Sequence, residues 1–128
     1  MSFVEPGLFD MIMRLRGRGI SDSNVLRAME LVKRSAFVAD EFVPQSYDER
    51  PIPIPCGQTL LAPLDVAIMC QSLDVQPGHK VLHVGIGSGY TTAVLAKMCT
   101  RVYGVDGYRS LVEDAEVNIA ECVHYTEL

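Results

Sequence analysis

The chain has 128 residues, which is enough for one domain with a sizeable hydrophobic core. Hydrophobic residues make up 48% and charged residues 21%, a composition that excludes a disordered or fibrous protein. The formal net charge of −5 argues against nucleic acid as the main partner, because a phosphate backbone attracts basic surfaces.

Two helices are predicted at the N-terminal end. The apolar residues between Leu8 and Leu15 recur at helical spacing, and the residues 16–19, "RGRG", end that pattern. Ser21 or Asp22 can cap a second helix, because both side chains carry an oxygen that accepts a backbone N–H. The predicted buried stripe of this second helix is Val25, Leu26, Met29 and Val32.

A proline-rich segment follows at residues 47–59, "YDERPIPIPCGQT". Proline lacks the backbone N–H and has a fixed φ, so we expect an extended loop here and not a central strand. Such a loop is either a spacer or a lid over a site, and the sequence alone favours neither. We place the boundary of the N-terminal region, residues 1–60, directly after it, which leaves residues 61–128 as the second region.

The second region alternates strands and helices, which predicts a βαβ unit with a parallel sheet and a right-handed crossover. It opens with an apolar helix that begins at a proline and that we expect to be buried on nearly every side. The predicted elements are a helix at 63–73, a turn at 76–80, a strand at 80–84, a helix at 90–99, a strand at 101–105 and a helix at 109–121.

The glycine-rich stretch "HVGIGSG", residues 83–89, joins the first strand to its helix. Glycines at 85, 87 and 89 permit a sharp turn and let a ligand approach the backbone at a helix N-terminus. Tyr90 stands where a dinucleotide-binding fingerprint needs a small residue, so the pattern fits the nucleoside site of S-adenosylmethionine enzymes better than an NAD site. His83 before the loop is either a packed, hydrogen-bonded strand residue or a catalytic base.

Asp106 ends the second predicted strand, 21 positions after Gly85. A carboxylate there can accept hydrogen bonds from both hydroxyls of a ribose. It can equally be a turn aspartate before Gly107. Combined with the glycine loop at this distance, ribose binding is the favoured interpretation.

The sequence also argues against membrane, secreted and zinc-binding proteins. No run of 18 apolar residues is present, and the N-terminus lacks the pattern of a secretory signal, so we expect a cytoplasmic protein without a membrane partner. The cysteines are too far apart for a C-x-x-C pair, and the histidines complete no zinc pattern. We therefore expect no metal, and reduced, buried and inert thiols at Cys56, Cys70, Cys99 and Cys122.

Several stretches in sequence order resemble the N-terminal part of the protein-L-isoaspartate O-methyltransferase family. These are "RLRGRGISD", "VLRAME", "FV", "YDERPIPIPCGQT", "VLHVGIGSGYTTAVLA" and "VYGVD". The resemblance extends over nearly the whole chain. It is specific, because the first stretch and the "GQT" loop are not general methyltransferase features.

The resemblance implies an α/β, Rossmann-like S-adenosylmethionine-dependent methyltransferase fold. It implies methyl transfer to the carboxylate of L-isoaspartyl residues in damaged proteins, as a protein repair step that needs no metal. Gln58 and Thr59 would belong to the active-site loop. The implied cofactor-binding residues are Gly85, Gly87, Gly89, Asp106, His83 and Tyr90.

The chain departs from the family pattern at three places. Leu61 stands where the family usually has a serine whose hydroxyl faces the reacting groups, and leucine offers no hydrogen bond. His83 replaces a Glu or Asp that helps to hold the methionine end of the cofactor. The segment Ile54–Pro55–Cys56 replaces the "PIG" that precedes "GQT" in many relatives, which stiffens the loop.

Only two parallel strands are predicted, and we expect a fold that is truncated after the second βα unit. Open strand edges invite pairing with another chain. We consider a shortened expressed chain, a shortened gene product, and a homo-oligomer that completes the sheet. The departures and the short sheet leave two alternatives to an active enzyme of this family: a catalytically inactive binding or assembly module, and a different nucleotide-binding enzyme such as an NAD-dependent oxidoreductase.

Overall fold

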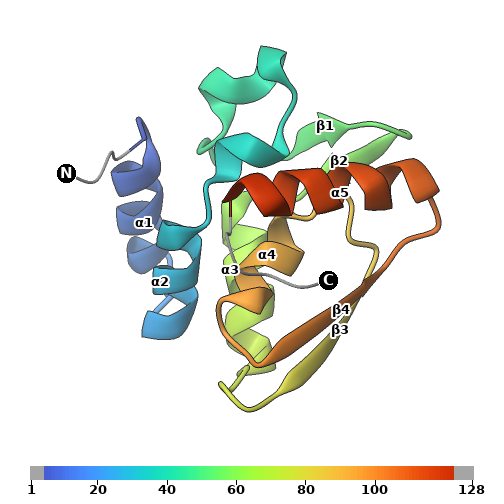
Figure 1. The fold of residues 1–128 in the computed structure, drawn as a ribbon. Coiled ribbons are helices and arrows are strands. Elements are labelled where there is room, and N and C mark those ends of the chain that lie inside the picture. Colours follow the sequence, from blue (N-terminus) through green and yellow to red (C-terminus); the bar gives the residue numbers. More distant parts are fainter. Residues whose placement is uncertain (1–4, 123–128) are drawn as a thin grey trace.

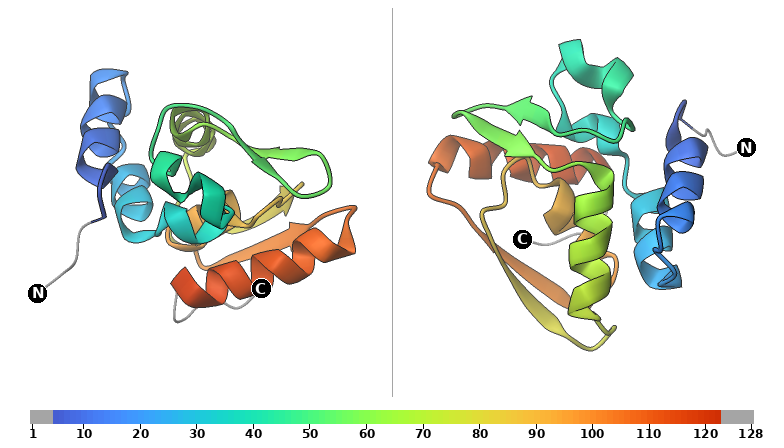
Figure 2. Two further views of the ribbon diagram at one scale, coloured as in Figure 1. Left: turned by 90° about the horizontal axis from the view of Figure 1, so that it is seen from above. Right: turned by 180° about the vertical axis from the view of Figure 1, so that it is seen from behind.

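The structure is a computed structural model that describes residues 5–122 (Figure 1). Its elements in chain order are α1 (Leu8–Gly17), α2 (Ser23–Leu31), the 3-10 helices η1 (Arg34–Phe37) and η2 (Asp40–Gln45), β1 (Ile52–Ile54), β2 (Gln58–Leu60), α3 (Pro63–Leu73), β3 (Lys80–Val84), α4 (Tyr90–Ala96), β4 (Arg101–Val105) and α5 (Arg109–Cys122). Helices α1 and α2 lie side by side, and the β3–β4 pair lies on the other side of α3 and α4 (Figures 1 and 2).

The predicted N-terminal helices are confirmed. Of the two possible caps, Asp22 is the one used, and its carboxylate accepts hydrogen bonds from the backbone N–H groups of Asn24 and Val25. The whole predicted stripe of the second helix is buried. An aspartate at this position also stabilises the helix because its negative charge faces the positive end of the helix dipole.

The proline-rich segment differs from the expected loop, because residues 52–60 form an antiparallel hairpin. Ile52 pairs with Leu60, Pro53 with Thr59 and Ile54 with Gln58. A two-stranded ribbon has two free edges, so it tolerates a proline that a central strand would exclude. The connecting turn contains Cys56 and Gly57, both with positive φ.

Helix α3 has the predicted bounds, with Pro63 in its first turn, but it is not buried on every side. Val66, Ala67 and Cys70 are fully buried, on the side that packs against α1 and α2. Ile68, Met69 and Leu73 are exposed, because within residues 5–122 no element covers that side of the helix.

The βαβ unit is confirmed. Strands β3 and β4 are parallel, with Lys80 opposite Arg101 and Val84 opposite Val105. Helix α4 connects them and ends at Ala96, three residues earlier than predicted. It lies in the middle of the core, with every residue from Tyr90 to Leu95 buried.

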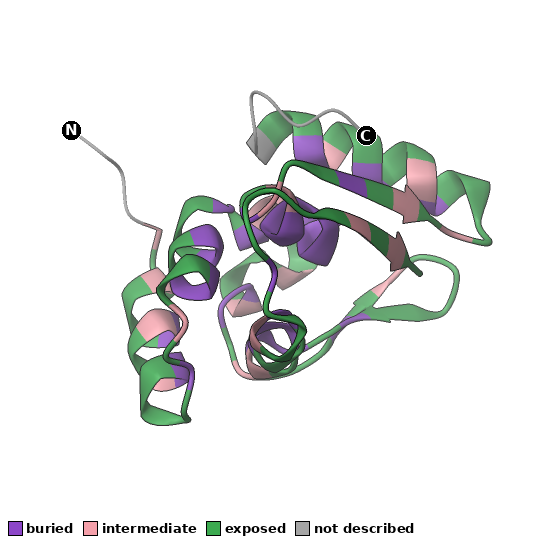
Figure 3. Cartoon of the chain, turned by 90° about the horizontal axis from the view of Figure 1, so that it is seen from below, coloured by how far each residue is buried: buried purple, intermediate pink, exposed green. Residues whose placement is uncertain are grey.

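The two faces of the β3–β4 pair differ. Side chains alternate between faces along each strand, and Val102 on one face is buried (Figure 3). The opposite face carries Leu82 and Val84, which are 63% and 72% exposed, together with Tyr103 and Val105. In the described part of the chain, this apolar face has no covering element.

Helix α5 packs through Leu111, Ala115 and Ile119, whereas Ala120 is exposed. Ala115 and Ile119 approach Gly89 so closely that a Cβ at residue 89 would lie 2.9 Å from the Ala115 Cβ. Gly89 also has a φ of 95°, which L side chains rarely adopt. Both the backbone conformation and the close packing of α5 therefore require glycine here.

We expect Gly89→Ala to lower the free energy of unfolding by about 2–4 kcal/mol, the combined cost of a strained backbone and an overpacked contact. Chemical denaturation of the wild type and the variant measures this difference. Gly17→Ala is the control, because nothing lies within 4 Å of the added Cβ at that position, and it should be neutral or slightly stabilising. Equal effects of the two substitutions would contradict the close contact with α5.

Candidate functional site

The loop at residues 85–89 follows β3 directly and begins helix α4. Gly85, Gly87 and Gly89 have φ values of 80°, 55° and 95°, so all three are in the left-handed region. The Gly85 N–H donates to the Val105 carbonyl at 2.8 Å, which extends the pairing of the two strands into the loop. The sharp turn from strand to helix therefore depends on glycine at each of these positions.

The three glycines face different surroundings. A Cβ at Gly85 would meet nothing within 4 Å, so the space beside this part of the backbone is open. A Cβ at Gly87 would lie 3.1 Å from the Ile54 Cδ1 of the hairpin. Gly89 lies under α5. The structure thus leaves the backbone accessible at Gly85, while it gives Gly89 a packing role.

Asp106 is held at the end of β4 by backbone N–H groups. One carboxylate oxygen accepts from Gly87 N at 3.1 Å, and the other accepts from Tyr108 N at 3.0 Å. These two bonds lower the pKa of Asp106, and the bond from Tyr108 contributes most to the shift. Asp106 therefore acts as a turn residue through its bond to Tyr108 N, and its other carboxylate oxygen binds the glycine loop.

Ribose binding by Asp106 stays a prediction. The side chain is partly exposed, and each carboxylate oxygen has lone pairs that remain available beyond its one backbone bond. The carboxylate can therefore accept further hydrogen bonds without giving up the two that fix it.

His83 lies on the partly buried face of β3. Its Nδ1 is 2.7 Å from the hydroxyl oxygen of Thr92 in α4. Burial lowers the pKa of His83, and the opposing effect of the Asp106 carboxylate is smaller. The observed contact is that of a packed, hydrogen-bonded residue, the first of the two interpretations made from the sequence.

Tyr90 is fully buried. Its ring makes an edge-to-face contact with Phe37, at 5.6 Å between ring centroids. The Arg34 guanidinium carbon lies 4.6 Å from the centroid of the Tyr90 ring. The described contacts of Tyr90 thus belong to the core. They lend no support to the prediction that its side chain lines a ligand pocket.

Gln58 and Thr59 are exposed on β2. The Gln58 amide donates to the Cys56 carbonyl at 3.1 Å. Cys56 also lies 3.5 Å, Sγ to Oγ, from Ser110 near the start of α5. With Ile54 beside Gly87, these contacts place the hairpin next to the glycine loop, and a catalytic role of Gln58 and Thr59 stays a prediction.

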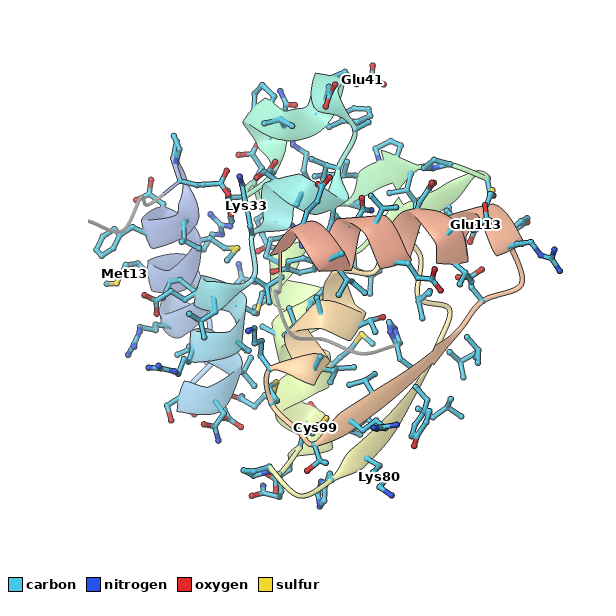
Figure 4. The ribbon with its side chains drawn as sticks, viewed as in Figure 1. Met13, Lys33, Glu41, Lys80, Cys99 and Glu113 are labelled. Carbon is cyan, nitrogen blue, oxygen red and sulfur yellow. The ribbon has the colours of Figure 1, made fainter. Side chains whose placement is uncertain are left out.

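The site follows the last residues of β3 and β4, so it lies at the end of the sheet opposite the one that Lys80 and Cys99 mark in Figure 4. Lys80, which starts β3, and Cys99, which precedes β4, lie together at the other end. Glu113 marks the part of α5 beside the hairpin. The loop and Asp106 are thus at the carboxyl ends of two parallel strands, where open α/β sheets bind their ligands.

The expectation of buried, inert thiols is wrong for Cys56, which is exposed because it lies in the turn of the hairpin. Burial raises the pKa of the Cys70 thiol to about 11, and it also raises the pKa of Cys99. Both therefore have the low thiolate content of inert cysteines. The side chain of Cys122 lies outside the described part of the structure.

Two polar residues near the site were not found from the sequence. The Asn118 amide on α5 donates to the Ser88 carbonyl at 3.0 Å and so holds the glycine loop from the outside. Arg34 is buried behind the hairpin and contacts Tyr90. An asparagine on the apolar side of a helix is a weak signal of such a bond, whereas a lone arginine in η1 gives no signal.

Among the described residues, no group of histidine, cysteine, aspartate or glutamate side chains could hold a metal ion. In the same part of the chain, no helix combines the length and the apolar character that crossing a bilayer requires.

Comparison with known proteins identifies the family of this chain. The model of the protein-L-isoaspartate(D-aspartate) O-methyltransferase family matches residues 9–125. The protein-L-isoaspartate O-methyltransferase of Maricaulis maris is 46% identical over 116 residues, which are 91% of this chain and 54% of the relative. That of Paracoccus denitrificans is 50% identical over 105 residues, 82% of this chain and 49% of the relative.

Solved structures agree with this result. A protein-L-isoaspartate O-methyltransferase from Plasmodium falciparum, solved in complex with S-adenosyl-L-homocysteine, superposes with a TM-score of 0.80 at 28% identity. The match covers 94% of this chain and 58% of that one. A second protein-L-isoaspartate O-methyltransferase, at 21% identity, has a TM-score of 0.77 and supports the fold. The expected methyltransferase fold is therefore confirmed, and this chain spans about half the length of the curated relatives it matches.

The lowered pKa of His83 makes stability depend on pH. Below the ordinary value of about 6.5, the unfolded chain takes up a proton at His83 before the folded chain does, so stability falls as the pH drops from there towards the folded pKa. NMR titration should give a His83 pKa below 6.5, and His83→Gln should remove this part of the pH dependence of unfolding. A His83 pKa at or above 6.5 would contradict the burial described here.

Proposed function

Because the chain belongs to the protein-L-isoaspartate O-methyltransferase family, we propose that the protein transfers a methyl group from S-adenosylmethionine to the carboxylate of L-isoaspartyl residues in damaged proteins. The observation that carries this proposal is the Asp106 carboxylate bound to Gly87 N of the glycine loop, with the hairpin beside it. Residues 1–60 supply the helical region and the active-site hairpin, and residues 61–128 supply the first part of the methyltransferase domain.

The residues present fit a nucleoside cofactor. The backbone at Gly85 is open on the side where a Cβ would stand, which leaves room for a ligand against the loop. Asp106 offers a fixed, ionised carboxylate at the end of β4, and ribose hydroxyls are donors that suit it. Burial lowers the pKa of His83 and so favours its neutral form, which does not repel a cationic ligand.

The proposed mechanism is one of positioning. S-adenosylmethionine, when bound, supplies an electrophilic methyl group. The open backbone at Gly85 would lie against the cofactor, and Asp106, held by Gly87 N, would accept hydrogen bonds from the ribose of the cofactor. On the substrate side, the Gln58 amide and the Thr59 hydroxyl orient the isoaspartyl carboxylate, whose oxygen must lie in line with the methyl carbon.

In this proposal methylation is a repair step that takes place in the cytoplasm. A free isoaspartyl carboxylate has no good leaving group, because attack on its carbon would have to expel an oxide. In its methyl ester the backbone nitrogen forms the new C–N bond, the C–OCH3 bond breaks, and methoxide leaves with the N–H proton as methanol. The resulting succinimide can hydrolyse to a normal aspartyl bond. The substrates are therefore proteins with exposed isoaspartyl residues, and not nucleic acids or membranes.

We expect S-adenosylhomocysteine to bind the purified chain with one-to-one stoichiometry in calorimetric titration. Asp106→Asn should weaken binding about 10- to 100-fold, the usual cost of losing hydrogen bonds to a charged group. Asp10→Asn removes the same charge from the exposed surface of α1, away from the glycine loop, and is the control that should bind normally. Equal affinities of the two variants would contradict the role of Asp106.

Methyl transfer is tested with a peptide that contains one L-isoaspartyl residue and with the same peptide containing normal aspartate. Radioactive methyl incorporation into the first peptide alone is the expected result. Cofactor binding without incorporation would contradict the proposed activity and would favour a methyltransferase-like binding or assembly module.

We further propose that the chain self-associates through the open edge and exposed face of the β3–β4 pair, where Leu82 and Val84 are 63% and 72% exposed. Leu82→Thr with Val84→Thr should shift sedimentation equilibrium towards monomer, because it removes apolar area from the contact. Val117→Thr, on the exposed side of α5, is the control and should leave the equilibrium unchanged. A wild-type chain that is monomeric at high concentration would contradict this proposal.

A further inference from the structure

Arg34 is the most unusual buried residue of the described chain. Its side chain is 0% exposed, although it lies in the short helix η1. Neither ion pair found in residues 5–122 includes it, since these join Arg14 to Glu49 and Arg50 to Asp48. Burying a cation without a carboxylate at hydrogen-bond distance is costly, so its other contacts must compensate.

Two of these contacts are short hydrogen bonds to backbone carbonyls. Arg34 Nε donates to the Ser46 carbonyl at 2.6 Å, and Nη2 donates to the Leu61 carbonyl at 2.7 Å. Ser46 precedes the hairpin and Leu61 directly follows β2. One guanidinium therefore holds both ends of the segment that carries Gln58 and Thr59.

The third contact reaches the glycine loop. The guanidinium lies 4.6 Å from the ring centroid of Tyr90, which is the first residue of α4 and follows Gly89 directly. An arginine over an aromatic ring is attracted by the electron-rich face of the ring. Tyr90 is in turn packed on Phe37, so the ring cannot easily move away.

The requirement is specific for arginine. Its planar group presents several N–H donors in fixed directions and has a flat face that stacks on a ring. A lysine ammonium is a point charge without such a face, and an apolar side chain fills space without binding either carbonyl. At position 34 the N–H donors bind the two backbone carbonyls, and the flat face of the guanidinium lies over the Tyr90 ring.

We propose that Arg34 is a positioning residue that fixes the hairpin against the glycine loop, so that Gln58 and Thr59 stay aligned with the cofactor site. This inference rests on the proposed function, because the hairpin is the substrate side only in that mechanism. The Leu61 anchor is a backbone carbonyl, so it does not depend on the side chain at position 61.

The test compares Arg34→Met with Arg14→Met. Arg14 Nη2 also donates to a backbone carbonyl, that of Tyr47, at 2.8 Å, but no hydrogen bond links it to residue 61. In Arg34→Met, we expect amide hydrogen exchange in residues 58–62 to become at least about tenfold faster, the effect of losing one or two hydrogen bonds, with α2 and α5 unchanged. Arg14→Met should leave exchange in residues 58–62 unchanged.

Cofactor and substrate readouts separate positioning from a general role in the core. S-adenosylhomocysteine affinity of Arg34→Met should stay within about threefold of wild type, whereas kcat for the isoaspartyl peptide falls at least about tenfold with little change in KM. Arg34→Lys should recover only a small part of kcat, because its ammonium can donate to a carbonyl but has no flat face to stack on Tyr90. Exchange that accelerates equally in all elements, or an unchanged hairpin, would overturn the proposal.

If Arg34→Met does not fold, NMR spectra of the wild-type protein test the proposal instead. Its Arg34 Nε–H should exchange slowly and should shift in NMR spectra when S-adenosylhomocysteine is added, because Tyr90 connects it to the loop. No response of this signal to bound ligand would overturn the proposal. Absence of methyl transfer in the wild type overturns the proposed function alone, since the exchange data still report whether Arg34 holds the hairpin.

Discussion

The sharp turn from β3 into α4 is the constraint on which the rest of the structure depends. Three alternating glycines with positive φ are needed to reverse the backbone within residues 85–89. The turn is then fixed from three sides, by the Val105 carbonyl, by the Asp106 carboxylate and by Asn118 of α5. A loop that is both glycine-rich and held in this way keeps one shape while its backbone stays accessible to a ligand.

Elements with a strong local signal could be predicted from the sequence. The two parallel strands, the crossover helix and a polar cap at residue 21 or 22 follow from periodicity and from residue chemistry near the helix ends, and the structure selects Asp22. The hairpin could not, because three-residue strands around Pro53 have no periodicity, and their pairing is stabilised by contacts outside the segment. The exposed side of α3 was also missed, since an apolar pattern does not say which neighbours are present.

The candidate site was predictable to a similar extent. Spacing alone placed Asp106 beside the glycine loop, because parallel strands bring their carboxyl ends to one edge of the sheet. It could not reveal that Tyr90 turns into the core, where Phe37 and Arg34 enclose it. These partners come from a 3-10 helix more than fifty positions earlier, so only the tertiary structure brings them together.

At position 61 the backbone and the side chain have separate roles. The leucine side chain, 40% exposed, cannot provide the hydroxyl that the family pattern has here. The Leu61 carbonyl nevertheless accepts the hydrogen bond from Arg34, so the hairpin keeps its attachment whatever side chain stands there. In the proposed reaction, the donors left on β2 for a substrate carboxylate are the Gln58 amide and the Thr59 hydroxyl, both exposed. Without the hydroxyl at position 61, only these two groups can bind and orient the substrate carboxylate. Their alignment therefore matters more than it would with a third donor.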